Sequence, residues 1–194
     1  MDEHLSEADP HLGLSLPPRI NVGGALRRWR VLNSLSQDAL AAHLGVSQVT
    51  ISRWEKGWAP ASAHEKNIRA LIEAKPTTAS DHALANLIET STEPYFLICD
   101  ISHNLLAASR KRALEWHQPV SDLIGTCFWR FATEEIDQVE RALEPSGWFD
   151  HPHSERQFFT SSADYDEIKI FEGQRKVVRI PLSDGRFARL VNDH

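Results

Sequence analysis

Residues 37–56 read QDALAAHLGVSQVTISRWEK, and this stretch decides the fold. A serine precedes each of its two apolar segments, at Ser36 and Ser47, and serine is among the best residues for starting a helix. Gly45 lies between the segments and tolerates the positive φ with which many helices end. The stretch therefore predicts one helix over Gln37–Leu44, a short turn, and a second helix over Gln48–Lys56.

The composition of the two helices favours a helix-turn-helix. Helices that cross at about 90–120° must approach closely, and the small side chain of Ala41 permits this. The apolar positions that would face a shared core are Leu40, Leu44, Val46, Ile51 and Trp54. The opposite face of the second helix carries Ser47, Gln48, Thr50, Ser52 and Arg53. Such a helix can enter the major groove of DNA, about 12 Å wide, and present hydrogen-bonding groups to base edges.

Further helices are predicted on both sides of this pair. Leu26, Trp29 and Arg30 open a helix that ends near Asn33–Ser34. After Gly57 and Pro60, Ser62 and Glu65 have the spacing of a capping box, which predicts a helix from Ser62 to about Ala74. The N-terminal part is therefore expected to be an all-α bundle of four to five short helices.

The C-terminal part has the pattern of an α+β module. A linker over 75–80 and a helix over Asp81–Glu89 come first, with Leu84, Leu87 and Ile88 on one face of that helix. Strands are expected over Tyr95–Cys99, Leu105–Ala108, Ile168–Phe171, Val177–Ile180 and Phe187–Val191. Helices are expected over Arg110–His117, Val120–Ile124 and Glu134–Leu143, and Ser183–Gly185 is a hairpin turn. We predict an antiparallel sheet with helices between its second and third strands.

Charge is unevenly distributed along the 194 residues, whose net charge is −6. Between positions 20 and 75 there are eight basic and four acidic residues, and the rest of the chain is acidic. This asymmetry indicates that the N-terminal part meets phosphate. The two cysteines, Cys99 and Cys127, are expected to be buried and reduced. Since no apolar run spans a membrane and the N-terminus lacks the zones of a signal peptide, we expect a cytoplasmic protein.

Residues 26–62, LRRWRVLNSLSQDALAAHLGVSQVTISRWEKGWAPAS, resemble the Cro/lambda-repressor-type helix-turn-helix family, also called the xenobiotic-response-element family. The resemblance implies that Gln48, Val49 and Arg53 read bases and that Gln37 and Lys56 bind phosphate. It also implies a structural pair between Arg30 and Glu55. The full set of residues expected to contact DNA is Gln37, Ser47, Gln48, Val49, Thr50, Ser52, Arg53 and Lys56.

Two positions depart from the family pattern. Ser34 stands where the family usually has glycine, so the first helix must end without it. The loop over Trp58–Ser62 lacks the basic residues often found there, which implies fewer phosphate contacts and a shallower salt dependence.

Residues 95–125, YFLICDISHNLLAASRKRALEWHQPVSDLIG, resemble the start of a PAS domain. The resemblance implies a sensory or dimerising module with a pocket between sheet and helices, without naming its ligand. We therefore divide the chain into a disordered leader over 1–20, a helix-turn-helix domain over 21–75, a linker and connecting helix over 76–92, and a PAS-like domain over 93–194.

No cofactor is identified from the sequence. Cys127 lies in Gly-Thr-Cys-Phe-Trp and not in the Asn-Cys-Arg helix of a flavin photosensor. Haem needs an axial ligand, for which His103 or His117 is a candidate, and a small-molecule ligand is also open. His151 and His153 have no evident third metal ligand and are expected in a solvated loop. The aromatics Phe128, Trp129, Phe131, Trp148 and Phe149 are expected in the core, with a pocket lining as the alternative.

The expected function is sequence-specific binding of double-stranded DNA by a transcriptional regulator. We expect a homodimer on an inverted repeat with half-sites about 10 bp apart. The Asp81–Glu89 helix and the C-terminal module are candidates for the dimer contact, although the apolar stripe of that helix can instead pack on its own sheet. An enzyme is not expected, because there is no Gly-rich phosphate loop or nucleophile elbow. The alternatives are a protein-interaction adaptor that uses the acidic module and an antitoxin-like partner.

Overall fold

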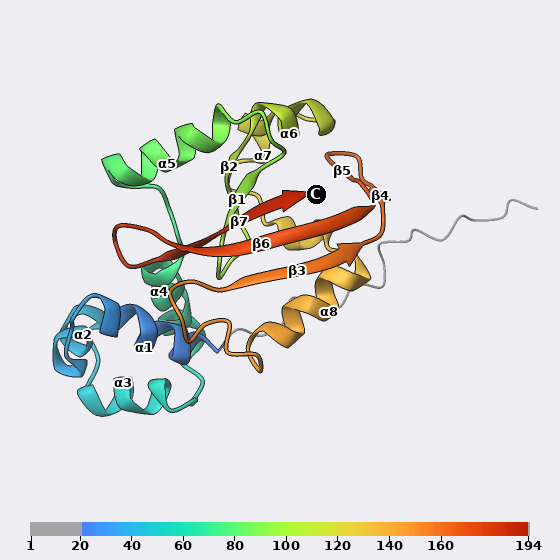
Figure 1. Ribbon diagram of the computed structural model, residues 1–194. Helices are drawn as coiled ribbons and strands as arrows, with labels where there is room; N and C mark the ends of the chain where they lie inside the picture. Colours follow the sequence, from blue (N-terminus) through green and yellow to red (C-terminus); the bar gives the residue numbers. More distant parts are fainter. Residues whose placement is uncertain (1–20, 194) are drawn as a thin grey trace, which may run out of the picture.

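The computed structural model describes residues 21–193 (Figure 1), so the predicted leader at 1–20 lies outside the described residues. The N-terminal bundle consists of α1 (Val22–Leu32), α2 (Gln37–Leu44), α3 (Gln48–Glu55) and α4 (Ser62–Ile72). A connecting helix, α5 (Ala79–Glu89), leads to the C-terminal sheet. The predicted order of an all-α bundle followed by an α+β module is confirmed.

Local capping defines the two central helices of the bundle. The Ser36 hydroxyl accepts a hydrogen bond from the backbone N–H of Ala39 at 3.0 Å, and the Ser47 hydroxyl accepts one from Thr50 N–H at 3.2 Å. Gly45 ends α2 with a φ of 67°. These starts and this stop are the ones that the sequence predicts.

The ends of the outer helices differ from the prediction. Helix α1 begins earlier than expected, because the Asn21 side chain accepts a hydrogen bond from Gly24 N–H at 2.9 Å. The predicted capping box at Ser62 is wrong, since the N-cap is Ala61 and makes no side-chain hydrogen bond. Glu65 is instead paired with Arg69 one turn later, at 2.9 Å.

Ser34 adopts a backbone conformation that glycine occupies most readily. Its φ is 54°, in the left-handed region that side chains other than glycine, asparagine and aspartate rarely occupy. The preceding Asn33 helps to end α1, because its side-chain amide donates to the carbonyl of Trp29 at 2.8 Å. The chain therefore makes the required turn without glycine, with some strain at Ser34.

The C-terminal module contains a five-stranded sheet in the order β2-β1-β7-β6-β3, and all its neighbouring strands are antiparallel. Its strands are β1 (Phe96–Cys99), β2 (Leu105–Ala108), β3 (Glu155–Thr160), β6 (Gly173–Pro181) and β7 (Phe187–Asp193). Between β2 and β3 the chain forms α6 (Arg110–Glu115), α7 (Val120–Leu123), the 3₁₀ helix η1 (Phe128–Phe131) and α8 (Glu134–Leu143). The predicted antiparallel sheet with helices between its second and third strands is confirmed.

Two predicted elements of this module need correction, and one strand was not predicted. The segment 168–171 does not join the main sheet, because only β5 (Lys169–Ile170) is extended and it pairs with β4 (Ala163–Asp164) in a separate ribbon. The first helix after the hairpin ends at Glu115, two residues early. The strand that was not predicted is β3, which starts at Glu155. Its first residues are charged or exposed, so the sequence there does not show the alternation of apolar and polar residues that is typical of a strand.

Both faces of the sheet are covered (Figure 1). On one face, Leu97 and Cys99 join a core that is continuous with Ile72 of α4 and Ile88 of α5. On the other face, Ile98 and neighbouring side chains pack against the segments that carry η1 and α8. The sheet therefore separates the N-terminal bundle from a second apolar region.

The apolar face of α5 is not the one that the sequence predicts. Ala85 and Ile88 are buried with Asp81, whereas Leu87 is 71% exposed. Asp81 is buried because its carboxylate accepts hydrogen bonds from the backbone N–H and the hydroxyl of Ser183, both at 3.0 Å. Helix α5 thus packs on the sheet of its own chain, and the hydrogen bonds between Asp81 and Ser183 connect it to the β6–β7 turn.

Candidate nucleic-acid interface

Helix α3 lies on the side of the bundle that faces away from the sheet (Figure 1). Ile51 and Trp54 anchor it in the core, and both are buried. Val49 is 55% exposed, and Arg53 and Lys56 are exposed as well. The outer side of α3 is therefore open to a macromolecular partner, and the acidic module does not cover it.

A chain of polar side chains connects α1, α2 and α3. The guanidinium of Arg30 donates to both oxygens of Glu55, at 2.6 Å and 2.9 Å, and to the carbonyl of Leu35 at 2.8 Å. Glu55 also accepts a hydrogen bond from the side-chain amide of Gln37 at 2.8 Å. Gln37 in turn accepts one from the amide of Gln48 at 2.6 Å. The proposed structural pair and the two glutamines thus form one network.

This network controls the ionisation of its carboxylate. Burial would raise the pKa of Glu55, but hydrogen bonds from Arg30 and Gln37 hold that pKa below its usual value. The hydrogen bond to Glu55 raises the pKa of Arg30. Both groups are charged near neutral pH, and the carboxylate fixes the amide of Gln37, which then orients Gln48 at the start of α3.

The remaining predicted contact residues occupy different environments. The hydroxyls of Ser47 and Thr50 lie 2.8 Å apart and bond to each other, so they are partly engaged in capping α3. Ser52 is half-buried. Arg53 and Lys56 lie at the exposed C-terminal end of the helix, where they are available for contacts with DNA.

Sequence reasoning missed two features of this surface. Trp58 is 67% exposed and lies with its ring 5.7 Å from the guanidinium carbon of Arg53, so it flanks that side chain. Gly23 of α1 touches α3 so closely that a Cβ atom there would lie 1.9 Å from the carbonyl oxygen of Trp54. The Gly23–Gly24 pair in a helical segment was the available signal for this close approach.

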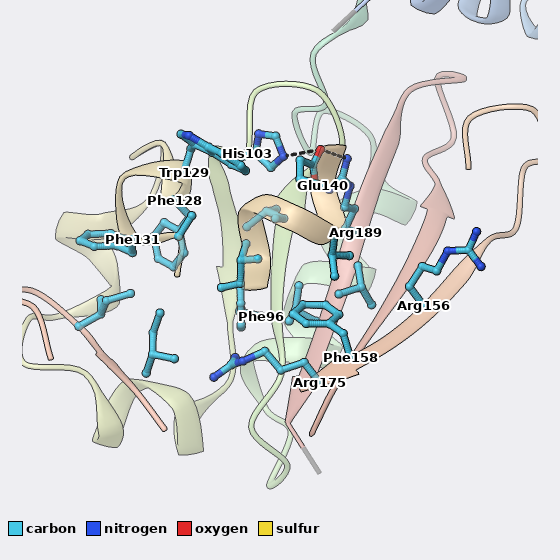
Figure 2. A pocket seen from close by; sticks show the side chains of 18 of the residues that line it. Phe96, His103, Phe128, Trp129, Phe131, Glu140, Arg156, Phe158, Arg175 and Arg189 are labelled. Atoms are coloured by element: carbon cyan, nitrogen blue, oxygen red, sulfur yellow. Dashed lines mark hydrogen bonds and ion pairs between the residues drawn. The ribbon is translucent and has the colours of Figure 1, made fainter. Parts of the chain in front are cut away.

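A second candidate site is a cavity of about 100 Å³ in the C-terminal module (Figure 2). It lies between the sheet and the segment that carries η1 and α8. Four aromatics that were expected in the core line it, namely Phe128, Trp129, Phe131 and Trp148. Phe149 is buried elsewhere. The core prediction is confirmed for Trp129, Phe131, Trp148 and Phe149, which are buried, and four of the five aromatics also line the cavity.

A network of buried charges borders this cavity. The Asp100 carboxylate is fully buried and accepts hydrogen bonds from Arg189 at 2.5 Å, Arg179 at 2.8 Å and the Trp148 indole at 3.0 Å. Arg189 is also paired with Glu140, whose other neighbour is His103 at 3.2 Å. Figure 2 shows His103, Glu140 and Arg189 side by side at one end of the cavity.

Mutual pairing keeps these groups ionised. Burial opposes the charge of Asp100, but Arg189 and Arg179 hold its pKa below the usual value. Burial likewise opposes the charge of Glu140, but Arg189 and His103 lower its pKa strongly. The pKa of Arg189 is raised, since Glu140 and Asp100 outweigh the effect of burial. The network therefore consists of charges that stabilise one another inside the protein.

The cysteines and histidines are placed as follows. Cys99 is buried as expected, but Cys127 is exposed, which corrects that prediction, and its thiol donates to the carbonyl of Ser102. His103 faces Glu140, whereas His117 bonds to Asp164 at 2.8 Å on the surface. The segment with His151 and His153 is exposed. Among residues 21–193, no group of three or more His, Cys, Asp or Glu side chains is placed to hold a metal ion.

Residues 26–74 match the helix-turn-helix family, which supports a DNA-binding regulator. No curated protein matches the sequence. Among solved structures, the chain is similar to the crystal structure of the PAS domain of an HTR-like protein from Haloarcula marismortui, with 15% sequence identity and a TM-score of 0.40, over 69% of this chain and 98% of that chain. In the part of the chain that is described, no helix is both long and apolar enough to cross a membrane.

Proposed function

We propose that the chain is a sequence-specific transcriptional regulator whose helix α3 enters the major groove of DNA. The observation that carries this proposal is the open outer face of α3, with Arg53 exposed and Gln48 held by Gln37. A glutamine or arginine presented on such a helix can form paired hydrogen bonds with adenine or guanine. The family match over residues 26–74 supports the same function.

The residues of this surface take different roles in the proposal. Gln48, Val49 and Arg53 contact base edges, while Gln37 and Lys56 contact phosphates. Ser47, Thr50 and Ser52 support the contacts along α3. Because Gln37 also holds Gln48 at 2.6 Å, its loss is expected to affect base reading as well as overall affinity. This coupling extends the purely phosphate-binding role that the sequence suggests.

Dimerisation on an inverted repeat is part of the proposal, with half-sites about 10 bp apart. The division at 21–75, 76–92 and 93–194 gives the DNA-binding domain, the connecting helix and the PAS-like domain. Leu87 of α5 and Leu114 of α6 are large apolar side chains that remain exposed, which supports a contact through this end of the module. Leu87→Asp should convert the dimer to a monomer in light scattering. A wild-type monomer on its operator would contradict this part.

Modulation through the PAS-like module is supported by the buried network. Glu140 and Arg189 line the cavity, whereas Asp100 and Arg179 line a hollow beside Arg28 of α1. The guanidinium of Arg28 lies 4.9 Å from the ring of Phe149, in the loop whose His151 carbonyl accepts from Arg179. A ligand that moves Arg189 would therefore shift groups that contact the bundle. This gives the two sites a continuous physical connection.

The test is fluorescence anisotropy with an operator selected from genomic DNA and with a random duplex. Arg53→Ala and Gln48→Ala should lose about 1–3 kcal/mol of discrimination between the two, because base contacts are removed. Lys56→Ala should weaken both duplexes alike. Lys111→Ala removes an exposed charge on α6 and serves as the control, with no expected change.

Two outcomes would contradict the proposal. Equal losses on both duplexes for Arg53→Ala would remove its base-reading role. Failure of the wild-type protein to select any DNA would favour the adaptor alternative, in which the bundle binds another protein. The loop over Trp58–Ser62, which has no basic residue, is the feature that favours that alternative.

A further inference from the structure

The cavity of the C-terminal module has hydrogen-bond donors without partners. The indole N–H of Trp129 and the Nε–H groups of Arg112 and Arg175 are buried and make no hydrogen bond. All three residues line the cavity, and each of these atoms can only donate. Buried polar groups are nearly always satisfied in native proteins, so these donors indicate missing acceptors at both ends of the cavity, with Trp129 beside His103 and Arg175 at the other end.

The charge of the lining favours an anion. The charged residues that line the cavity are Arg112, Arg156, Lys169, Arg175, Arg189 and Glu140. Glu140 is already paired with Arg189, and the other charged side chains of the lining are cationic, of which Arg112 is also paired with Glu115 at 2.8 Å and Lys169 with Asp164 at 3.6 Å. Arg112 and Arg175 share Asp193, at 2.6 Å and 2.5 Å. Burial chiefly lowers the pKa of Arg175, although Asp193 raises it, so additional negative charge would stabilise its charged form.

The rest of the lining is aromatic and sets the size of the occupant. The rings of Phe96, Trp116 and Phe128 are neighbours, with centroid distances of 5.3–5.9 Å. Arg112 lies over the Phe96 ring at 5.5 Å, so the cationic end meets the aromatic wall directly. An engineered apolar cavity of about 150 Å³ accommodates benzene. The cavity here is smaller, about 100 Å³, so the aromatic part of its occupant can be at most a single ring.

We propose that this cavity binds a small aromatic carboxylate, with the carboxylate at Arg112 and Arg175 and the ring against Phe96 and Phe128. Figure 2 shows the Arg175 side chain next to Phe158 at the end of the cavity opposite His103, Glu140 and Arg189. The carboxylate end is thus separate from the network that leads to the bundle. The proposal names the ligand class of the cavity, while the coupling to the bundle through Arg189 is tested separately, and the ligand class does not depend on whether α3 reads DNA.

The first test uses the full-length protein without DNA and four probes of similar shape. Benzoate, benzamide, benzyl alcohol and benzylamine are titrated by calorimetry and by the change in tryptophan fluorescence. Benzoate should bind at least about ten-fold more tightly than the other three, because only it carries the negative charge that the guanidiniums complement. Equal binding of benzamide, tighter binding of benzylamine, or no binding of benzoate at millimolar concentration would overturn the proposal.

The second test compares two neighbouring cationic side chains of β6, one that lines the cavity and one that does not. Arg175→Gln should weaken benzoate binding by about ten-fold or more and leave the weak benzamide binding nearly unchanged. Lys176→Gln is the control, since this side chain follows Arg175 on β6, is paired with Glu155 and does not line the cavity. Equal effects of the two substitutions would overturn the assignment. If Arg175→Gln does not fold, the comparison of benzoate with benzamide on the wild type still decides the proposal.

A third measurement distinguishes the ligand class of the cavity from the proposed role of the protein as a DNA-binding regulator. DNA affinity is measured by anisotropy at saturating benzoate. A change in affinity supports ligand modulation of the regulator. Benzoate binding with unchanged DNA affinity would overturn that coupling, while the ligand class would stand on the calorimetry. Absence of DNA binding would overturn the proposed function and leave the cavity assignment to the first two tests.

Discussion

The guanidinium of Arg30 and the carboxylate of Glu55 are joined by two hydrogen bonds, although they are 25 residues apart in the sequence. This pair ties α1 to the last turn of α3 and is mostly shielded from solvent. The side-chain amide of Gln37 donates to the same carboxylate, and the side-chain oxygen of Gln37 accepts a hydrogen bond from Gln48. The position of Gln48 therefore depends on that of Glu55. The orientation of Gln48, which we propose to contact DNA, therefore depends on a contact that lies behind it.

Arg30→Ala is expected to destabilise the protein by about 2–3 kcal/mol, because it leaves the partly buried Glu55 without its charged donor. Urea unfolding followed by circular dichroism measures the effect. Arg27→Ala, which removes an exposed arginine from the same helix, is the control and should change stability by less than about 0.5 kcal/mol. Similar losses in both variants would show that the ion pair does not stabilise the bundle.

The lowered pKa of Glu55 predicts a dependence of stability on pH. A carboxylate whose pKa is lower in the folded than in the unfolded state stabilises the fold above its unfolded pKa, here near 4.5. That contribution disappears as the pH falls through the folded pKa. Glu55→Gln should therefore lose less stability than the wild type between pH 6 and pH 3. Parallel stability profiles of the two proteins would argue against the shift.

Asp100→Asn tests the buried network of the sheet. The substitution leaves Arg179 and Arg189 without the full negative charge between them, and an uncompensated buried charge typically costs about 3–5 kcal/mol. Chemical unfolding gives the value. Asp166→Asn, at an exposed position, is the matched control and should be nearly neutral. A small effect at Asp100 would mean that water or rearranged side chains compensate the arginines.

Gly23 and Gly24 are adjacent residues for which opposite outcomes are expected. A Cβ at Gly23 would lie 1.9 Å from the carbonyl oxygen of Trp54, so Gly23→Ala should separate α1 from α3 and destabilise the bundle strongly. For a Cβ at Gly24 the nearest atoms belong to the Asn21 side chain, at 3.2 Å. This side chain is exposed at the start of α1 and can move. Gly24→Ala should therefore be neutral or stabilising by up to about 1 kcal/mol, since alanine favours the helix. Thermal unfolding distinguishes the two, and equal effects would refute the close packing.

Local signals in the sequence predicted the centre of the bundle well. Ser36, Gly45 and Ser47 act on backbone groups within three or four residues, so their effects can be read from the chain itself. The same reasoning failed at Ser62, because a serine at the correct spacing does not oblige the backbone to place it at the N-cap. It also failed for 168–171, where an apolar run packs beside the sheet and not in it.

The candidate sites divide in the same way. The residue types on the outer face of α3 follow from helical periodicity, so the sequence identifies Gln48 and Arg53 as candidates. The anchoring of Gln48 by Gln37 depends on how two helices cross, as does the contact of Gly23 with Trp54. The sequence predicts the cavity only through its resemblance to a PAS domain. It does not show which side chains place hydrogen-bond donors on the cavity wall.

The sequence by itself determined the helix-turn-helix, its caps and the antiparallel character of the second module, because these rest on interactions between near neighbours and on the period of apolar residues. Only the tertiary structure decided that Asp100 meets Arg179 and Arg189, which are 79 and 89 residues away, and that residues with unpaired donors line an aromatic cavity. The physical reason is that sheet register and helix packing bring these side chains together, and no local pattern records which distant partners will meet.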